Sequence, residues 1–189
     1  MNSAIDGQRP LVREEYTNTA KFLHWTVAIC VLTLIPAGLA MNNVPEGPLQ
    51  NTLYTVHRSL GALVLGLMIL RLGYRLINGW PAPEPTITPA QRIASHAVHN
   101  LLYLLLIVQP ALGWYATSAY GATISFFGLF NLPALTEKNE PLSEQLFVVH
   151  ELLGFAIAGL VLLHISGALY HYFIRRDGVL QRMLPRRTR

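Results

Sequence analysis

The chain has 189 residues, of which 52% are hydrophobic and 13% are charged, and its formal net charge is +4. Soluble domains carry about 25% charged residues, so this composition excludes an ordinary soluble enzyme and indicates a membrane protein. The single cysteine, Cys30, excludes an internal disulfide and a cysteine-ligated cluster. We interpret Cys30 as a small packing residue of the first helix.

Four apolar segments approach or exceed the roughly 20 residues that a transmembrane helix needs. They are residues 22–42, 54–76, 94–118 and 147–173. The first is longer than the core of a signal peptide and follows a leader with three acidic residues, so we expect a permanent helix. The connections are too short for a second domain. We therefore predict an all-α membrane protein in which residues 1–189 form one domain, a four-helix transmembrane bundle.

Prolines and glycines mark the connections. Pro36 should kink the first helix near its outer end, because proline removes a backbone donor. The second connection, NGWPAPEPTITPAQ (78–91), is too rich in proline for a regular helix. The third contains the apolar stretch ISFFGLFNLP (124–133), which we predict to be an interfacial turn or short helix that lies on the membrane or caps the bundle.

Basic residues are distributed unequally between the two sides of the predicted bundle. Only Arg58 and Lys138 fall on the side of the first and third connections. The other side has Arg9, Arg13, Lys21, Arg71, Arg75, Arg92, Arg175, Arg176, Arg182, Arg186, Arg187 and Arg189. The positive-inside rule then places both termini in the cytoplasm. We interpret the basic tail as a topology signal that meets anionic lipid, and we expect no nucleic-acid binding.

All seven histidines lie in or at the ends of the four apolar segments. They are His24, His57, His96, His99, His150, His164 and His171. A polar side chain at membrane depth is costly unless it has a partner, so such residues indicate function. A histidine that only hydrogen-bonds another helix is the alternative for each one taken singly.

The spacing of the histidines predicts two levels of ligands. His150 and His164 are separated by about four helical turns, which puts them on one face about 21 Å apart, and His171 continues the same stripe. The second and fourth segments run in the same direction, so His57 lies level with His150. His24 lies near the opposite surface and can pair with His164 or His171; depth counting slightly favours His171 and leaves the choice open.

Facing imidazole pairs are typical of axial haem ligation. A zinc enzyme would need three clustered ligands, often as H-E-x-x-H, and the HELLG sequence at 150–154 lacks the second histidine. Haem iron takes two axial imidazoles between helices. Arg58 and Arg71 could bind its propionates, although Arg71 could equally be a snorkelling residue. Small residues at Gly61, Gly66, Gly154, Gly159 and Gly167 would leave room for the macrocycle, or serve as ordinary helix contacts.

An ordered set of motifs along nearly the whole chain resembles the bacterial di-haem cytochrome b561 family, which includes a superoxide oxidase. The motifs are KFLHW (21–25), VHRSLG (56–61), SHAVH (95–99), FFGLFNLP (126–133), VVHELLG (148–154), LHISGALYHYF (163–173) and RMLPRR (182–187). The resemblance implies two b haems between the helices, one on His57 and His150 and one on His24 and His164. It thus favours His164 over His171 as the inner ligand.

The resemblance also implies a function in the bacterial inner membrane. Superoxide would be oxidised to oxygen at the periplasmic side, with Arg58 guiding the anion, and ubiquinone would accept the electrons near His96, His99 and His171. The alternative is a haem-b subunit that anchors a soluble redox partner, a dehydrogenase or hydrogenase, and passes its electrons to quinone. A histidine-lined metal or proton transporter is a third possibility, which would lack haem.

Overall fold

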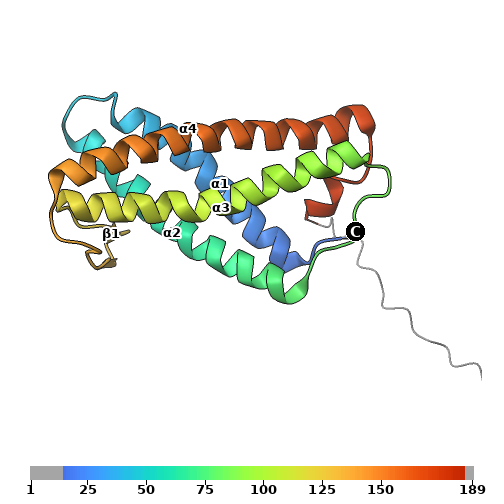
Figure 1. Cartoon of the computed structure of the whole chain (residues 1–189), viewed down its shortest axis with the longest axis horizontal. Coiled ribbons are helices and arrows are strands. Elements are labelled where there is room, and N and C mark those ends of the chain that lie inside the picture. The colour runs from blue at the N-terminus through green and yellow to red at the C-terminus, as the bar shows by residue number, and fades with distance from the viewer. Residues whose placement is uncertain (1–14, 186–189) are drawn as a thin grey trace, which may run out of the picture.

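A computed structural model of the chain describes residues 15–185, most of which lie in four long α-helices. They are α1 (Asn18–Met41), α2 (Pro48–Asn78), α3 (Pro89–Tyr120) and α4 (Glu140–Tyr170). All four are long and apolar enough to cross a membrane, and Figure 1 shows them side by side along the long axis. The predicted four-helix membrane bundle is therefore confirmed.

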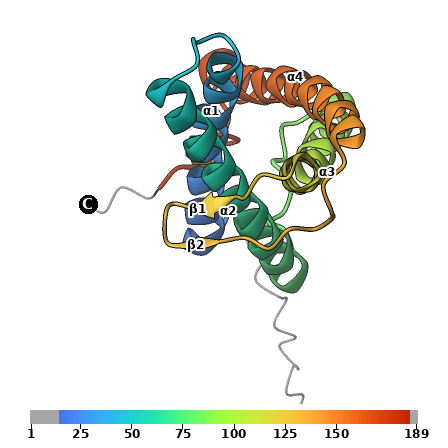
Figure 2. The same ribbon diagram turned by 90° about the vertical axis from the view of Figure 1, so that its left-hand side faces the viewer.

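The two ends of the bundle differ. At one, called the hairpin end, lie the α1–α2 connection and a small hairpin of β1 (Ser125–Phe126) and β2 (Phe130–Asn131). At the other, the tail end, α1 begins and α2 and α4 finish. Viewed end-on, α1 packs on α2, α2 on α3 and α3 on α4 (Figure 2). Arg9, Arg13, Arg186, Arg187 and Arg189 of the predicted charge asymmetry lie outside the described residues.

Each of the four helices begins before its predicted segment, and polar side chains cap the starts of α1, α3 and α4. Thr17 accepts a hydrogen bond from the Ala20 amide at 3.2 Å and begins α1. Thr88 and Gln91 form a capping box, so α3 begins at Pro89, inside the stretch expected to be irregular. Proline is tolerated there, since the first helical amide has no partner to lose. Hydropathy marked only the part of each helix that meets lipid.

The packed core lies between the levels of the histidines. Val27, Val31, Val64, Met68 and Ile157 are at most 5% exposed and form one cluster. Cys30 is buried in the same cluster, which confirms its interpretation as a packing residue. An apolar layer therefore separates the two histidine levels.

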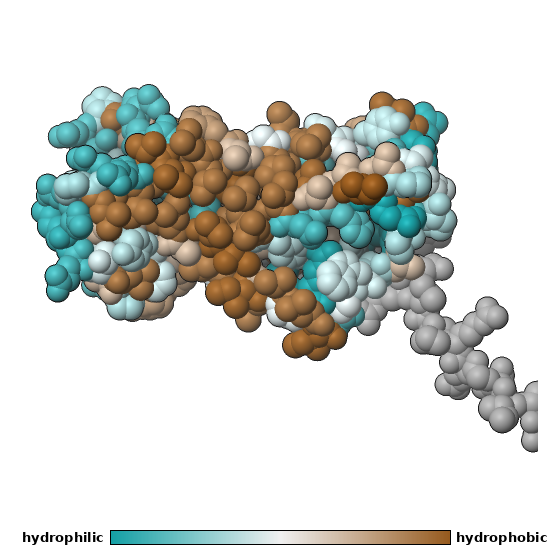
Figure 3. All heavy atoms as spheres, viewed as in Figure 1, coloured by the Kyte–Doolittle hydropathy of each residue, from teal (hydrophilic) through white to brown (hydrophobic). Residues whose placement is uncertain are grey.

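Apolar side chains also cover the outside of the bundle. On the face drawn in Figure 3, a broad hydrophobic band crosses the middle of the molecule, with hydrophilic residues gathered toward both ends. Leu70, Leu104, Phe155 and Leu162 are each more than half exposed. Such a surface is stable in lipid and would aggregate in water, in agreement with four membrane-spanning helices.

The apolar stretch 124–133 forms a hairpin, so the short helix expected as one alternative is wrong. Ser125 pairs with Asn131 and Phe126 with Phe130, and the chain reverses at Phe127 and Gly128, both with positive φ. Ser59 of α2, which is fully buried, donates to the Ser125 carbonyl at 2.9 Å and accepts from the Phe127 amide at 3.1 Å. One hydroxyl therefore attaches the hairpin to α2, two residues from His57.

Candidate functional site

The structure brings four of the predicted histidines together as two facing pairs. The ring centres of His57 on α2 and His150 on α4 are 6.2 Å apart, and those of His24 on α1 and His164 on α4 are 6.1 Å apart. We call them the hairpin-level pair and the tail-level pair. Metal–imidazole bonds of about 2.0 Å, with each ring centre about 1.1 Å behind its nitrogen, place two rings across one ion about 6 Å apart. Both separations therefore fit one metal ion per pair.

Three of the four paired imidazoles have a buried nitrogen without a hydrogen bond within residues 15–185. Nδ1 of His24, His57 and His150 is buried and forms no hydrogen bond within the described part of the chain. Buried polar atoms are nearly always satisfied, so three unbonded Nδ1 atoms are unusual for side chains that serve packing alone.

The hairpin-level rings lie in two similar notches on neighbouring helices. A Cβ at Gly38 of α1 would lie 3.1 Å from Cε1 of His57, and one at Gly113 of α3 would lie 2.8 Å from Cε1 of His150. In α1, the backbone carbonyl of Leu34, four residues before Gly38, faces the His57 ring. In α3, the carbonyl of Gln109, four residues before Gly113, faces the His150 ring in the same way. In both cases the geometry at Nδ1 falls short of a hydrogen bond. A metal-bound imidazole commonly directs its other nitrogen at a backbone carbonyl. The notches orient both rings in this way.

Gly38 and Gly113 were not predicted from the sequence, where other glycines were expected to make room for the macrocycle. Gly66 and Gly159 follow His57 and His150 by nine residues, about half a turn round the helix, and both are exposed. Gly167 is also exposed, so these three do not make room between the helices. Gly61 does line the space beside His57. The sequence signal that could have identified Gly38 and Gly113 is their depth in the bundle, which is that of His57 and His150.

A pocket with a cavity volume of about 90 Å³, partly open to solvent, lies at the hairpin level. Its walls come from all four helices and the third connection and include His57, Arg58, Gly61, Gly113, Ile124 and His150. Most of the lining is apolar, as in typical cofactor pockets. A flat apolar ring with a central metal suits such a site.

Other metal sites fit less well. Within residues 15–185, no group of three or more His, Cys, Asp or Glu side chains is arranged to hold a metal ion. His99 also lies against His164, but the ring centres are 5.1 Å apart, which is too close for one ion between them. Two-imidazole ligation across a bundle is the geometry of an axial haem pair.

The family model for prokaryotic cytochrome b561 matches residues 15–186. The chain belongs to the prokaryotic cytochrome b561 family. Proteins of this family are membrane electron-transfer proteins that bind haem b, and the paired imidazoles of this chain fit that cofactor.

Several curated proteins are similar to this cytochrome b561 over most of its length. Cytochrome b561 homolog 2 of Escherichia coli (strain K12) is 31% identical over 90% of this chain and 92% of its own. The probable superoxide oxidase CybB of Yersinia pestis is 27% identical over 87% and 93%, and cytochrome b562 of Cereibacter sphaeroides is 29% identical over 89% and 94%.

At the hairpin end, one basic side chain of the described residues lies beside the histidines. Arg58 lines the pocket, and its guanidinium carbon lies 5.2 Å from the centre of the Tyr54 ring. Lys138 lies on the surface and pairs with Glu140 at 2.6 Å, and this hydrogen bond raises the pKa of the lysine. Arg58 forms no ion pair with a carboxylate in residues 15–185. It is therefore the local positive charge at this pocket.

The remaining histidines lie at the tail end. His96 is exposed, and His99 is partly buried with Nδ1 3.3 Å from the Ser95 hydroxyl. His171 begins a π-helical turn, His171–Arg175, and its Nδ1 lies 2.6 Å from Oδ2 of Asp177. No hydrogen bond or ring contact joins His171 to His96 or His99 within the described residues. The structure therefore brings His99 to the tail-level pair and directs His171 to Asp177.

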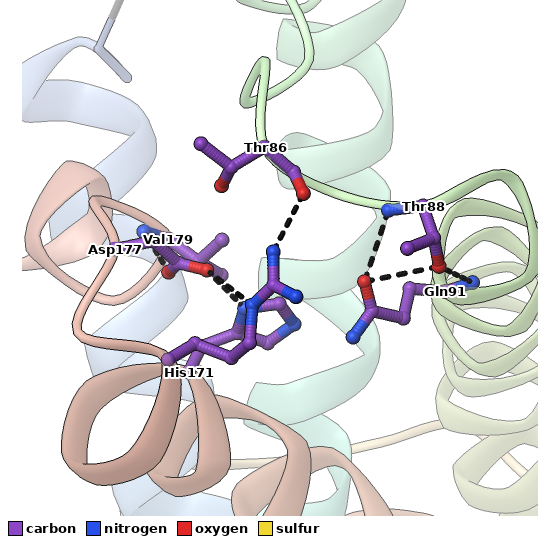
Figure 4. Close-up of polar contacts among 7 residues, drawn as sticks. Thr86, Thr88, Gln91, His171, Asp177 and Val179 are labelled. Carbon is purple, nitrogen blue, oxygen red and sulfur yellow. Dashed lines mark hydrogen bonds and ion pairs between the residues drawn. The ribbon is translucent and has the colours of Figure 1, made fainter.

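Further contacts fix the Asp177 side chain. Its second oxygen accepts from the Val179 amide at 3.2 Å, and Arg175 Nε lies 3.8 Å from Oδ2 (Figure 4). Arg175 also donates to the Thr86 carbonyl of the α2–α3 connection at 2.6 Å, and Arg182 donates to the Ala82 carbonyl. The side chains of His171 and Asp177 are only 13% and 6% exposed. Asp177 was not predicted as a site residue from the sequence, because its partner His171 is six residues away across an irregular turn.

Proposed function

We propose that this cytochrome b561 holds two haems, with His57 and His150 as the axial ligands at the hairpin level and His24 and His164 at the tail level. The observation that carries the proposal is the presence of two facing imidazole pairs whose ring centres lie 6.2 and 6.1 Å apart. When bound, haem supplies one-electron chemistry, and two imidazoles leave iron no open position for oxygen. His171 is not a ligand in this proposal, since its ring is held by Asp177.

The protein around these sites separates and orients them. The apolar layer of Val64, Met68 and Ile157 keeps water from the space between the two levels. The Gly38 and Gly113 notches hold the hairpin-level rings against their helices. These features suit transfer of single electrons along the bundle between a donor at one end and an acceptor at the other.

We propose superoxide as the donor at the hairpin end and ubiquinone as the acceptor at the tail end, in a bacterial inner membrane. The predominance of basic residues at the tail end supports a cytoplasmic location for it and for both termini. Arg58 beside the hairpin-level pair supplies the charge that would guide an anion. The name of the Yersinia pestis relative, a probable superoxide oxidase, is in line with this substrate.

At the tail end, His99 and His171 are the proposed quinone-side residues. Asp177 accepts a hydrogen bond from Nδ1–H of His171, so Nε2 is the ring nitrogen directed away from Asp177 that could hydrogen-bond a quinone oxygen and relay a proton to it. His96 is exposed, and we assign it to the entrance of the site, where proton exchange with water is direct.

A second function is favoured by the charges at the hairpin end. Five glutamates, at positions 46, 137, 140, 144 and 151, outnumber Arg58 and Lys138 there. A net negative surface suits a basic soluble redox partner better than a free anion. The chain would then be an electron-transfer and anchoring subunit for a dehydrogenase or hydrogenase, with the same haems.

Haem content tests the proposed ligands. His57→Ala or His150→Ala should lose one haem and His24→Ala or His164→Ala the other, whereas His171→Ala should retain both. The measurement is the haem-to-protein ratio with the reduced optical spectrum of each variant. Two haems in His164→Ala and one in His171→Ala would refute the tail-level assignment, and a colourless wild-type protein would refute haem binding.

Superoxide pulses distinguish the two functions. Rapid reduction of the purified protein by superoxide, followed by reoxidation on adding a quinone, is expected of a superoxide oxidase. Arg58→Glu should slow only the first step, and Glu144→Gln is the matched control. Slow reduction in wild type together with a bound partner enzyme would support the anchoring subunit.

A further inference from the structure

We propose that Arg71 and Arg75 of α2 form a binding site for carboxylates, and that they bind the propionates of the haem held by the tail-level pair. The inference rests on the proposed haem at His24 and His164. It assigns to Arg75 a role that its sequence position did not indicate and makes Arg71 part of a two-residue site.

The two arginines share one aromatic ring. They are one turn apart near the end of α2, and their guanidinium carbons lie 5.2 Å (Arg71) and 4.9 Å (Arg75) from the centre of the Tyr103 ring on α3. Arg75 is also 4.5 Å from the Trp80 ring centre. The rings fix two like charges side by side, which is unfavourable unless an anion lies between or beside them.

The protein supplies no such anion among the described residues. Neither arginine forms an ion pair with a carboxylate of residues 15–185, and Nε of Arg75 is buried without a hydrogen-bond partner. Lys21, the fully buried cation at the same end, is by contrast 3.1 Å from Glu15. A buried Nε without an acceptor is costly, so Arg75 is expected to have an acceptor beyond the described residues.

The position of the arginines identifies the anion. Arg71 follows His57 by fourteen residues on α2, as His164 follows His150 on α4, so Arg71 lies on the same helix face as His57 and at the depth of the tail-level pair. A haem b between His24 and His164 brings two carboxylates into this region, and guanidinium groups match carboxylates with paired hydrogen bonds. The phosphate of an anionic lipid binds guanidinium groups by the same chemistry and is the other source of an anion for this site.

The two guanidiniums should then influence the tail-level haem electrostatically. Reduction removes one positive charge from the iron, so nearby positive charge favours the reduced form. The expected result is that Arg71→Gln, Arg75→Gln and above all the double variant lower the midpoint potential of one haem and leave the other unchanged. The affected haem should be the one lost in His164→Ala. Arg92→Gln, an exposed arginine on α3, is the control.

Redox titration followed by optical spectroscopy, with phosphorus analysis of the purified protein, tests the proposal. Unchanged midpoints in the double variant would overturn it, and loss of bound phospholipid with unchanged midpoints would assign the site to lipid. Retention of both haems in His24→Ala and His164→Ala would instead refute the proposed function. If the glutamine variants do not fold, Arg71→Lys and Arg75→Lys replace them, because lysine keeps the positive charge. The propionate bands in the redox infrared difference spectra of these lysine variants should shift. Unchanged propionate bands in both variants would overturn the inference.

Discussion

Gly113 of α3 and His150 of α4 lie so close that any side chain at position 113 would displace the imidazole. A Cβ built on Gly113 would be 2.8 Å from Cε1 and 3.2 Å from Nδ1 of the ring. Gln109, one turn earlier, donates from Nε2 to the His150 carbonyl at 2.7 Å and so fixes the backbone of α4 beside the notch. The orientation of His150 therefore depends on α3, a helix that supplies none of the four proposed axial ligands.

We expect Gly113→Ala to lower occupancy of the hairpin-level haem and to shift its midpoint potential, because the methyl group must rotate or push the ring. Overpacking of this kind costs about 1–3 kcal/mol. Gly159→Ala adds the same methyl group on the exposed side of α4 and should leave both haems unchanged. Equal haem content and potentials in the two variants would mean that the notch does not position the ring.

The angles between paired rings predict the magnetic spectrum of the oxidised protein. The imidazole planes meet at 81° in the tail-level pair and 73° in the hairpin-level pair. Near-perpendicular axial rings leave two iron d orbitals almost equal in energy, which makes a low-spin ferric haem strongly anisotropic. Low-temperature EPR should therefore give two signals of unusually large gmax. A spectrum typical of parallel rings would show that the rings turn when haem binds.

Much of the architecture follows from hydropathy and from the spacing of the histidines. A stretch such as 147–173 must be a helix in lipid, because only a helix satisfies its own backbone there. Once α2 and α4 run in the same direction, His57 and His150 must lie at similar depth. The presence of one histidine pair at each of two levels could thus be expected from helical geometry alone.

The rest depends on contacts between residues remote in sequence. Depth counting slightly favoured His171 opposite His24, and it could not anticipate the π-helical turn that directs His171 to Asp177. The hairpin at 124–133 depends on Ser59, sixty-six residues before its Ser125 partner. Gly38 and Gly113 differ from other membrane glycines only in what lies opposite them on the next helix.

We expect Ser59→Ala to release the hairpin from α2. The substitution leaves the Phe127 amide and the Ser125 carbonyl without their partner, at a cost of about 1–3 kcal/mol. Amide hydrogen exchange of residues 125–131 should accelerate, while exchange in α2 remains slow. Thr55→Ala, which removes an exposed hydroxyl bonded only to the carbonyl of Asn51, is the same-helix control. Unchanged exchange in the hairpin would show that its own strand pairs and turn suffice.

The hydrogen bond between His171 and Asp177 gives the last prediction. A hydrogen bond to a charged group contributes about 1.5–3 kcal/mol, so its loss in Asp177→Asn should slow reoxidation of the reduced haems by a soluble ubiquinone analogue by roughly tenfold or more. The asparagine keeps the size of the side chain but can present an N–H to the ring, which favours the wrong tautomer. Haem content and midpoint potentials should stay at wild-type values, because His171 is not a proposed ligand.

Glu84→Gln removes a nearby carboxylate of the α2–α3 connection and should leave the rate unchanged. Equal rates in both variants would exclude the pair from the quinone reaction, and loss of a haem in Asp177→Asn would return His171 to the list of ligands.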